Sequence, residues 1–423
     1  MRDGGRLAAA IEVLGDIVAR HKPARMALKA WGDSARYAGA KDRAFVSGLV
    51  LDVLRRRRSL AWRMGDDGDR AAVLGAVRFL WGWELPRVEA AAGEPHGPGA
   101  LTDADRARLA VDPGVANAPP PVRGDYPDFL DPSLARVFGE DRAAEGEALA
   151  ERAPVDLRVN TLKTDTARVM KALAPFDPQA SDLLPTAIRI VPPAASERGA
   201  AIETAPEFEK GWFEVQDLGS QLAAARAGDI AGQQVLDFCA GGGGKTLALA
   251  AAMGNRGQLY AYDSDARRLT DTVRRAQRAG VRNLQVRSPI HPEPLKGLEG
   301  RMDVVFVDAP CTGSGVWRRH PDAKWRLTPQ QLARRMAEQD GVLAQAAVFV
   351  KPGGRLVYVT CSLLAEENED RVAGFLHGHP DFASVPATGP ADAFLAAAGS
   401  LRLTPRTSGT DGFFVAVLLR GGR

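Results

Sequence analysis

Three cysteines lie where they could take part in chemistry. Cys311 follows the apolar run of DVVFVDAPC, and Cys361 follows the apolar run of GGRLVYVTC. Cys239 lies in VLDFCAGGGGKT, where an apolar run passes into a glycine turn. A thiolate is a nucleophile, and groups directly after parallel strands share one edge of a sheet. The sequence therefore predicts one site with thiol chemistry.

Charged residues near the same positions could assist a thiol. Asp308 ends the run before Cys311, Asp263 ends QLYAYD, and Lys245 follows the glycines. A free thiol has a pKa of about 8.5, so a nucleophilic cysteine needs positive potential or a base beside it. Lys245 is a candidate source of that potential, and Asp308 a candidate acid.

The elements that must position these residues are short apolar runs, each followed by a segment with helical spacing. This alternation predicts β-α-β units and an α/β fold with a mostly parallel sheet covered on both faces. The ligand crevice of such a sheet lies outside the carboxyl ends of its strands. The predicted strands are Val235–Phe238, Gln258–Tyr262, Leu284–Val286, Asp303–Val307, Arg355–Val359 and Phe413–Leu419.

The glycine run limits the choice of ligand. A phosphate-binding loop needs a glycine where this chain has Cys239, and the dinucleotide fingerprint needs glycine or alanine where it has Leu247. What remains is a glycine turn after the first strand and Asp263 after the second. A carboxylate there suits the ribose hydroxyls of an adenosine ligand.

Composition is that of an ordinary globular protein, with 45% apolar and 25% charged residues in 423. Residues 1–63 carry fourteen Lys/Arg against six Asp/Glu, whereas the whole chain has a net charge of only +3. A basic module favours a polyanionic partner. We find no membrane-length apolar run, no export signal, and no cysteine spacing typical of disulfides or zinc. We expect a cytoplasmic monomer without a metal or a membrane partner.

Four segments follow from the pattern: a helical domain over 1–92, a Pro/Gly-rich linker over 93–124, a small α/β domain over 125–205 and the main α/β domain over 206–423. Two basic stretches could contact RNA. Arg55, Arg56, Arg57 and Arg58 close a predicted helix, where they either reach a phosphate backbone or stabilise the helix end. Trp317 and Trp325 flank Arg318, Arg319 and Lys324, and could stack on single-stranded RNA or simply pack in the fold.

The segments LDFCAGGGGKT, DAPCTGSG and VTCS, in this order, resemble the Sun/Fmu family of S-adenosylmethionine-dependent RNA cytosine-5 methyltransferases. GWFEVQDLGSQL, RAPVDLRVNTLK, EENE and DGFF also match that pattern, so the resemblance covers roughly residues 125–423. KDRAFVSGLVLDVLRRR is similar to the NusB-like RNA-binding domain of members that act on 16S ribosomal RNA. The resemblance implies a Rossmann-like methyltransferase domain that makes 5-methylcytosine in RNA, foremost in 16S ribosomal RNA.

The resemblance also implies roles. Cys361 is the nucleophile that adds to the base, Cys311 assists release, and Asp308 and Lys245 touch the cytosine. Residues around S-adenosylmethionine are Cys239, Ala240, Gly241, Gly242, Gly243, Gly244, Lys245, Asp263 and Asp308. Where the family usually has an acid near adenine, this chain offers Ser288.

Several alternatives stay open. The residues alone leave the order of the two thiols undecided, because Pro-Cys at Cys311 is the arrangement of the nucleophile in DNA cytosine-5 enzymes. The substrate could be transfer RNA or DNA. A phosphate-loop nucleotide hydrolase in ribosome assembly and a catalytically idle RNA-binding assembly factor are the alternatives of other classes.

Overall fold

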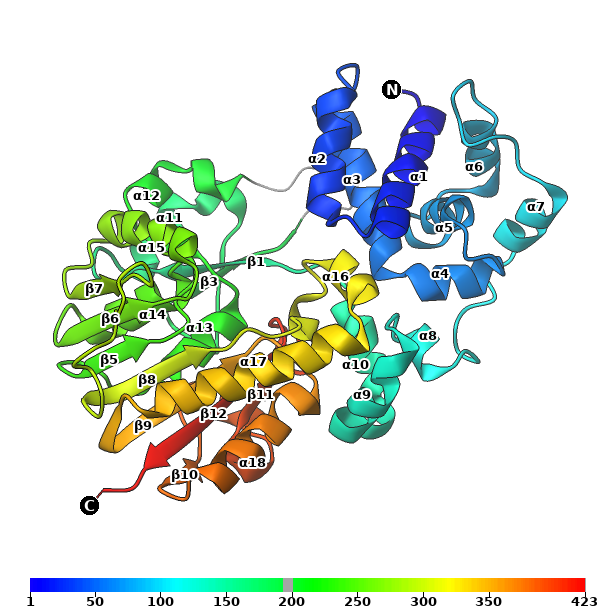
Figure 1. Ribbon diagram of the computed structural model, residues 1–423. Coiled ribbons are helices and arrows are strands. Elements are labelled where there is room, and N and C mark those ends of the chain that lie inside the picture. The colour runs from blue at the N-terminus through cyan, green and yellow to red at the C-terminus, as the bar shows by residue number, and fades with distance from the viewer. Residues whose placement is uncertain (193–200, 423) are drawn as a thin grey trace. The chain divides into compact units, whose positions relative to one another are not determined.

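The structure is a computed structural model that describes residues 1–192 and 201–422. The chain forms two compact units (Figure 1). A helical unit comprises Met1–Arg152 and Val316–Leu327, and an α/β unit comprises Ala153–Pro192, 201–315 and 328–422. Residues 193–200, which we assigned to the small α/β domain, and residue 423 lie outside the described residues.

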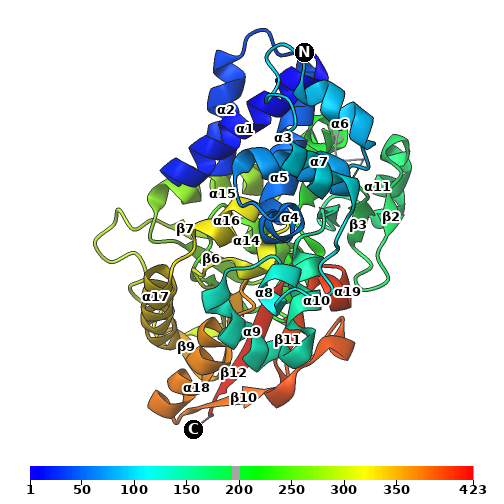
Figure 2. The ribbon, with the colours of Figure 1, turned by 90° about the vertical axis from the view of Figure 1, so that its right-hand side faces the viewer.

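The helical unit is built from amphipathic helices. Leu7 and Leu14 of α1, and Leu49 and Val53 of α3, lie at helical spacing and are buried in its core. Figures 1 and 2 show α1 and α3 side by side. The helices are α1 (Asp3–Arg20), α2 (Ala24–Ser34), α3 (Ala40–Arg55), α4 (Arg57–Met64), α5 (Asp69–Gly75) with a π-helical extension (Ala76–Leu80), α6 (Leu85–Ala92), α7 (Asp103–Ala110), α8 (Pro120–Arg123), α9 (Asp131–Phe138), α10 (Arg142–Leu149) and α16 (Pro321–Arg326).

The structure differs from the prediction in the Pro/Gly-rich segment. It contains α7, which begins with a capping box between Thr102 and Asp105. Leu101 and Leu109 are buried in the core of the helical unit. Two apolar residues eight positions apart are too few to reveal a helical period. The Pro/Gly-rich composition was therefore interpreted as that of a linker.

Two further segments lie in the helical unit rather than in the α/β domains that we predicted. Residues 125–152 form α9 and α10 there. Residues 316–327 contain α16, which packs on α3. Lys324 Nζ donates to the Arg55 carbonyl (2.7 Å), and Trp325 Nε1 donates to the Leu54 carbonyl (2.6 Å). Local sequence shows that these segments are helical, but not which core they join.

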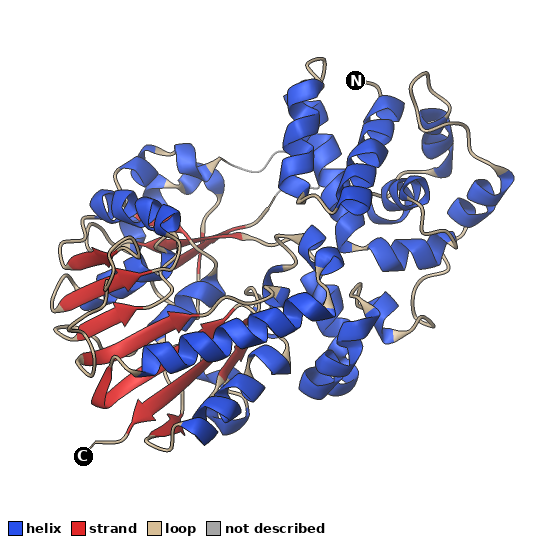
Figure 3. Cartoon of the chain, viewed as in Figure 1, coloured by secondary structure: helices blue, strands red, loops and turns tan. Residues whose placement is uncertain are grey.

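The α/β unit is organised around an eight-stranded sheet in the order β10-β12-β9-β8-β5-β6-β7, with β11 paired to β12. Figure 3 draws the strands in red. All pairings from β9 to β7 are parallel, and β12 joins β9 antiparallel. The predicted α/β class and all six predicted strands are confirmed. The strands are β5 (Gln234–Asp237), β6 (Gln258–Tyr262), β7 (Leu284–Arg287), β8 (Met302–Asp308), β9 (Val350–Thr360), β10 (Phe382–Val385), β11 (Leu401–Leu403) and β12 (Phe413–Arg420).

Both faces of this sheet are covered. Alternate residues of β8 point to opposite cores: Val304 and Phe306 pack in one apolar cluster, and Val305 and Val307 in the other. This double burial explains the continuous apolar run in the sequence. The helices of the unit are α11 (Thr166–Ala172), α12 (Pro206–Glu209), α13 (Leu218–Ala225), α14 (Gly244–Met253), α15 (Ala266–Ala279), α17 (Pro329–Ala347), α18 (Glu369–Gly378) and α19 (Pro405–Ser408).

A second, antiparallel sheet has the order β2-β3-β1-β4, with β1 (Val155–Val159), β2 (Gln179–Ala180), β3 (Ala187–Ile190) and β4 (Phe213–Val215). Polar contacts fix it to α15. Asn160 Nδ2 donates to the Ala279 carbonyl (2.8 Å), and buried Glu214 forms ion pairs with Arg275 and Arg278. The two sheets therefore form one unit. No helix within the described residues is long and apolar enough to cross a membrane.

Candidate active site

The carboxyl ends of the central strands carry acidic side chains. Asp237 ends β5, Asp263 follows β6, and Asp308 ends β8. Asp237 is fully buried and its Oδ2 accepts from Thr246 Oγ1 (2.6 Å), while its Oδ1 has no hydrogen-bond partner among the described residues. Burial raises the pKa of Asp237 to about 7, against the opposing effect of the Thr246 hydrogen bond.

The glycine turn between β5 and α14 has a backbone conformation that requires glycine at two positions. Gly241 and Gly243 have φ of 53° and 85°, a region that favours glycine. A side chain at Gly243 would also clash with Thr272. Gly241 N donates to Asp263 Oδ2 (2.8 Å), so the turn and the end of β6 form one surface. A Cβ at Gly244 would meet no atom within 4 Å, which shows space at the start of α14.

Lys245 and Asp308 form a close ion pair, with Nζ 2.7 Å from Oδ2. Lys245 Nζ also lies 5.1 Å from the centre of the Phe413 ring. Burial lowers the pKa of Lys245, but the charge and hydrogen bond of Asp308 outweigh burial, so that the pKa is raised. The charge of a Cys361 thiolate contributes in the same direction. Lys245 is therefore a fixed cation beside the thiols.

The two cysteines after β8 and β9 are brought together. Cys311 Sγ lies 3.4 Å from Cys361 Sγ, although 50 positions separate the residues. The hydrogen bond to Cys361, followed by burial and by the charges of Cys361 and Glu367, raises the pKa of Cys311 well above its usual value. Both thiols are free, and so is Cys239.

Cys239 and Ser288 stand apart from this pair. Burial and the charge of Asp237 raise the pKa of Cys239 well above its usual value, which suits a packing residue rather than a nucleophile. Ser288 follows β7, is half-buried, and accepts from Ile290 N of its own loop (3.4 Å). Ala240 is buried, and its N–H donates to the Tyr262 carbonyl (2.9 Å).

Two residues near the thiols had no role in our sequence-based site. Phe413 contacts Lys245, and Glu367 contacts the residues that follow each cysteine. Phe413 lies in DGFF and Glu367 in EENE, two segments that match the family pattern. The sequence therefore pointed to these segments but not to a chemical role for either residue. Gly412 of DGFF lies against the Cys311 loop: its N–H donates to the Gly315 carbonyl (2.8 Å), and a side chain on either glycine would clash with the other.

The predicted RNA contacts need correction. Arg55, Arg318 and Lys324 are only 8%, 4% and 1% exposed, so they are not available to RNA in this structure. Arg55 donates to the Arg318 carbonyl (2.9 Å) and pairs with Asp52 (2.9 Å). Burial lowers the pKa of Lys324 to about 7. The cationic run in the sequence thus contains buried structural groups.

The other members of the arginine run are paired at the surface of the helical unit. Arg56 pairs with Glu151, Arg57 with Asp69, and Arg58 with Asp128. Arg319 is half-exposed. Trp317 is 1% exposed, so the packed alternative for this tryptophan holds.

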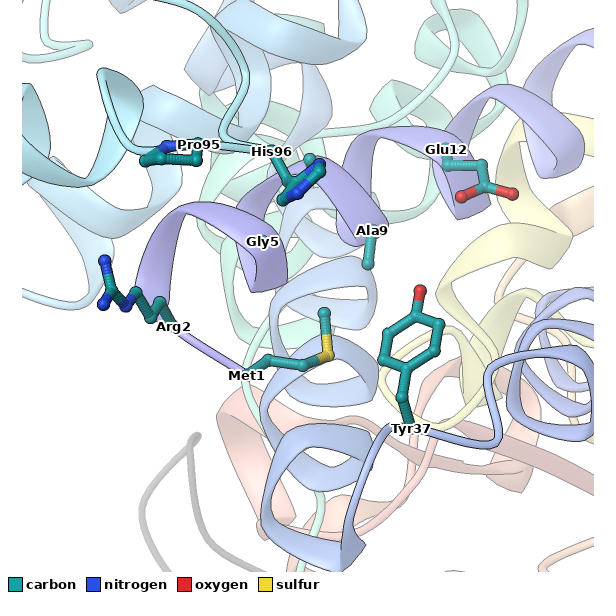
Figure 4. A pocket seen from close by; sticks show the side chains of 9 residues that line it. Met1, Arg2, Gly5, Ala9, Glu12, Tyr37, Pro95 and His96 are labelled. Atoms are coloured by element: carbon teal, nitrogen blue, oxygen red, sulfur yellow. The ribbon is translucent and has the colours of Figure 1, made fainter.

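Pockets in the helical unit were not predicted from the sequence. One, of about 480 Å³, is lined by Arg56, Arg63, Arg123 and Arg152 together with Phe79 and Trp81 among others. Another, of about 630 Å³, lies beside the start of α1, with Met1, Glu12, Tyr37 and His96 around it (Figure 4). Its nine lining residues include none of the predicted site residues. Among the described residues no cluster of His, Cys, Asp and Glu could hold a metal ion.

Comparisons with known proteins agree on one family. The model of the family described as 16S rRNA methyltransferase RsmB/F matches residues 229–419. A probable ribosomal RNA small subunit methyltransferase B of Synechocystis is 33% identical over 303 residues, covering 69% of this chain and 66% of that protein. Ribosomal RNA small subunit methyltransferase B of Photorhabdus laumondii is 30% identical over 70% of this chain and 66% of its own length. The aligned part thus falls just short of two thirds of these relatives.

Solved structures show the same fold. The protein PH0851 has a TM-score of 0.73 at 26% identity, covering 99% of both chains. A methyltransferase homologue from Pyrococcus horikoshii has a TM-score of 0.60 at 28% identity, covering 73% of this chain and 100% of its own.

Proposed function

Because this chain belongs to the RsmB/F family of methyltransferases, as the resemblance in its sequence implied, we propose that it methylates carbon 5 of a cytosine in 16S ribosomal RNA. The cofactor predicted from the sequence, S-adenosylmethionine, is confirmed at the level of this family. The hypothesis of a nucleotide hydrolase is contradicted by membership in a methyltransferase family. A cytoplasmic monomer remains part of the proposal.

The residues at the strand ends fit that cofactor. Asp263 presents a carboxylate at the end of β6 beside the Gly241 N–H, and the space at Gly244 lies at the start of α14. We propose that Asp263 accepts hydrogen bonds from the ribose hydroxyls and that the turn from Cys239 to Gly244 surrounds the cofactor. When bound, S-adenosylmethionine supplies an electrophilic methyl group. Ser288 remains our candidate for a contact with adenine.

The observation that carries the proposal is the thiol pair of Cys311 and Cys361 beside the Lys245 and Asp308 ion pair. Carbon 5 of cytosine is a poor nucleophile until a thiolate adds to carbon 6. We propose that Cys361 forms this bond and that carbon 5 then takes the methyl group, whose bond to the sulfonium sulfur breaks. A base next removes the carbon 5 proton, and the bond from Cys361 to carbon 6 breaks, which returns the thiolate. Asp308 and Lys245 contact the base, and Cys311 assists its release.

Electrostatics supports this order of the two thiols. Lys245 and a Cys361 thiolate attract each other, since the charge of Cys361 helps to raise the pKa of Lys245. The charge of Glu367 instead favours a neutral Cys311. A protonated Cys311 is therefore favoured, which leaves Cys361 as the attacking thiol.

We propose that RNA also contacts the helical unit, at the pocket lined by Arg56, Arg63, Arg123 and Phe79. Arg123 is exposed, and Arg63 lies 5.7 Å from the Phe79 ring. Cationic groups next to an aromatic ring suit a phosphate and a stacked base. This pocket takes the place of the contacts at Arg318 and Lys324. Arg55 also lines it but is bound to Asp52 and the Arg318 carbonyl, and Asp52, Glu147 and Glu151 are the acidic members of the lining.

The function is tested by incubating the protein with methyl-tritiated S-adenosylmethionine and unmodified 16S ribosomal RNA, transfer RNA or DNA. We expect label in 16S ribosomal RNA, with bisulfite sequencing showing one protected cytosine. Label confined to transfer RNA or DNA would favour those substrates. Cofactor binding without transfer to any of the three would favour an idle assembly factor.

A further inference from the structure

Glu367 is a buried carboxylate that the proposed mechanism does not use. Its side chain is 0% exposed in the 3-10 turn Ala365–Glu367 between β9 and α18. Its oxygens accept from Thr312 N (2.8 Å), Thr312 Oγ1 (2.5 Å), Ser362 Oγ (2.5 Å) and Gln339 Nε2 (3.0 Å). A carboxylate that receives four donors is acting as an acceptor only.

The partners of Glu367 are the immediate neighbours of the two thiols. Thr312 follows Cys311, and Ser362 follows Cys361. One carboxylate group thus joins two loops that are distant in the sequence. Gln339 extends the connection to the other side of Cys311, because its Nε2 also donates to the Pro310 carbonyl (2.9 Å).

Further hydrogen bonds join the same two loops. Ser314 Oγ lies 3.0 Å from Ser362 Oγ, and Gly315 N donates to the Cys361 carbonyl (2.9 Å). Tyr358 Oη donates to the Glu367 carbonyl (2.7 Å), which fixes the backbone that carries the carboxylate. Hydrogen bonds therefore fix the Cys311 loop to the Cys361 loop, and Glu367 is bonded to both.

Among the residues that the structure describes, the partners of Glu367 are neutral donors. A charge buried without a cationic partner is expensive, so a neutral residue would serve packing alone better. The charge has an effect on the thiols, since it contributes to the raised pKa of Cys311. These two properties, the hydrogen bonds and the charge, point to a function for the carboxylate.

We propose that Glu367 is a positioning residue, which holds the sulfur atoms of Cys311 and Cys361 in contact. The inference deepens the proposed function and rests on it only for the catalytic use of the thiols. The contact between the two sulfur atoms exists in the protein without RNA or cofactor, so it can be tested without an assay of methylation.

The test measures how readily the two thiols react with each other. Diamide takes two electrons and two protons from a pair of thiols, which become a disulfide while diamide becomes a hydrazine. We expect the wild type to form the Cys311–Cys361 disulfide rapidly, as followed by mass spectrometry of the native protein. Glu367→Ala should form it at least about tenfold more slowly, because a displacement of about 1 Å strongly reduces reaction between held groups.

Glu369→Gln is the matched control. This glutamate lies two positions further on and pairs with Arg402 rather than with Thr312 or Ser362, so its variant should oxidise like the wild type. Equal rates in Glu367→Ala and the wild type would overturn the positioning role. If Glu367→Ala does not fold, Thr312→Val removes one donor with little change in shape and should slow oxidation in the same direction; an unchanged rate there would equally count against the proposal.

Glu367→Gln separates charge from geometry. The amide can still bind the two loops, so disulfide formation should stay within about threefold of the wild type, whereas the midpoint of Cys311 alkylation by iodoacetamide should move to lower pH. A midpoint that does not move would overturn the effect of the Glu367 charge on the pKa of Cys311. If 16S ribosomal RNA is not the substrate, methylation fails in the wild type while these thiol measurements still give their results.

Discussion

Cys311 and Cys361 have their sulfur atoms 3.4 Å apart at the ends of the neighbouring parallel strands β8 and β9. Opposite outcomes are expected when either is replaced. Cys361→Ala should abolish methyl transfer and form no covalent adduct with RNA, while cofactor binding survives. Cys311→Ala should still attack but release slowly, trapping protein on RNA in denaturing electrophoresis. Adduct in Cys361→Ala and none in Cys311→Ala would reverse the order of the thiols.

Asp263 should govern cofactor affinity. Loss of a charge-assisted hydrogen bond costs roughly 1.5 to 3 kcal/mol, so Asp263→Ala should weaken S-adenosylmethionine binding by about tenfold or more in calorimetry. Asp265→Ala is the control, because Asp265 caps α15 two positions away. Equal dissociation constants for the two variants would remove Asp263 from the cofactor site.

Arg55 and Arg58, neighbours in one run, should differ in their effect on stability. Arg55 is buried between Asp52 and the Arg318 carbonyl, and breaking such a pair typically costs about 3 to 5 kcal/mol. Arg58 pairs with the exposed Asp128, a contact worth about 1 kcal/mol or less. The free energy of unfolding measured in urea should therefore be clearly lower for Arg55→Ala than for Arg58→Ala. Similar midpoints and slopes for both would contradict the buried role of Arg55.

Lys324 should make stability depend on pH above neutrality. Burial lowers its pKa in the folded state to about 7, from 10.5 when unfolded. Between these values the unfolded chain holds one more proton, so the free energy of unfolding rises with pH, by up to about 1.4 kcal/mol per pH unit. Below pH 7 both states are protonated and the dependence vanishes. Lys324→Met should flatten the rise, whereas Lys29→Met, at an exposed lysine, should retain it.

RNA binding by the helical unit should be visible in its salt dependence. Arg63→Ala combined with Arg123→Ala should weaken binding of 16S ribosomal RNA and reduce the slope of log K against log salt by about one to two units. The affinity for S-adenosylmethionine should stay unchanged. Replacing Arg36, a cation of the helical unit outside the pocket lining, gives the control. An unaltered slope in the double variant would exclude the pocket.

The parallel core could be predicted because each of its strands carries its own signal. Asp303–Val307 is rich in β-branched residues on both faces, and the Gly241 and Asp263 positions follow from the order of the strands. The short β11 has no such signal; its three residues pair with β12 through long-range packing. Sequence placed Cys311 and Cys361 at one sheet edge, but only the fold could show that their sulfur atoms touch.

Charge was harder to interpret than strand pattern. Arg55 and Arg58 belong to the same run, yet Arg55 is buried whereas Arg58 is not, and the Arg55 guanidinium pairs with Asp52 and donates to a backbone carbonyl. For Arg55 that carbonyl belongs to Arg318, far along the chain. A local pattern cannot reveal such a partner, so the basic run was assigned to RNA.

The contact between Gly315 and Gly412 restricts how the chain can vary. Since a side chain on either residue clashes with the other, no change at one position can be offset by a change at the other. Gly315 N is also bonded to the Cys361 carbonyl, and Gly412 directly precedes Phe413 beneath Lys245. The Cys311 loop and the start of β12 are therefore joined, and an insertion between Asp411 and Phe413 would displace the contacts of Cys361 and of Lys245 together.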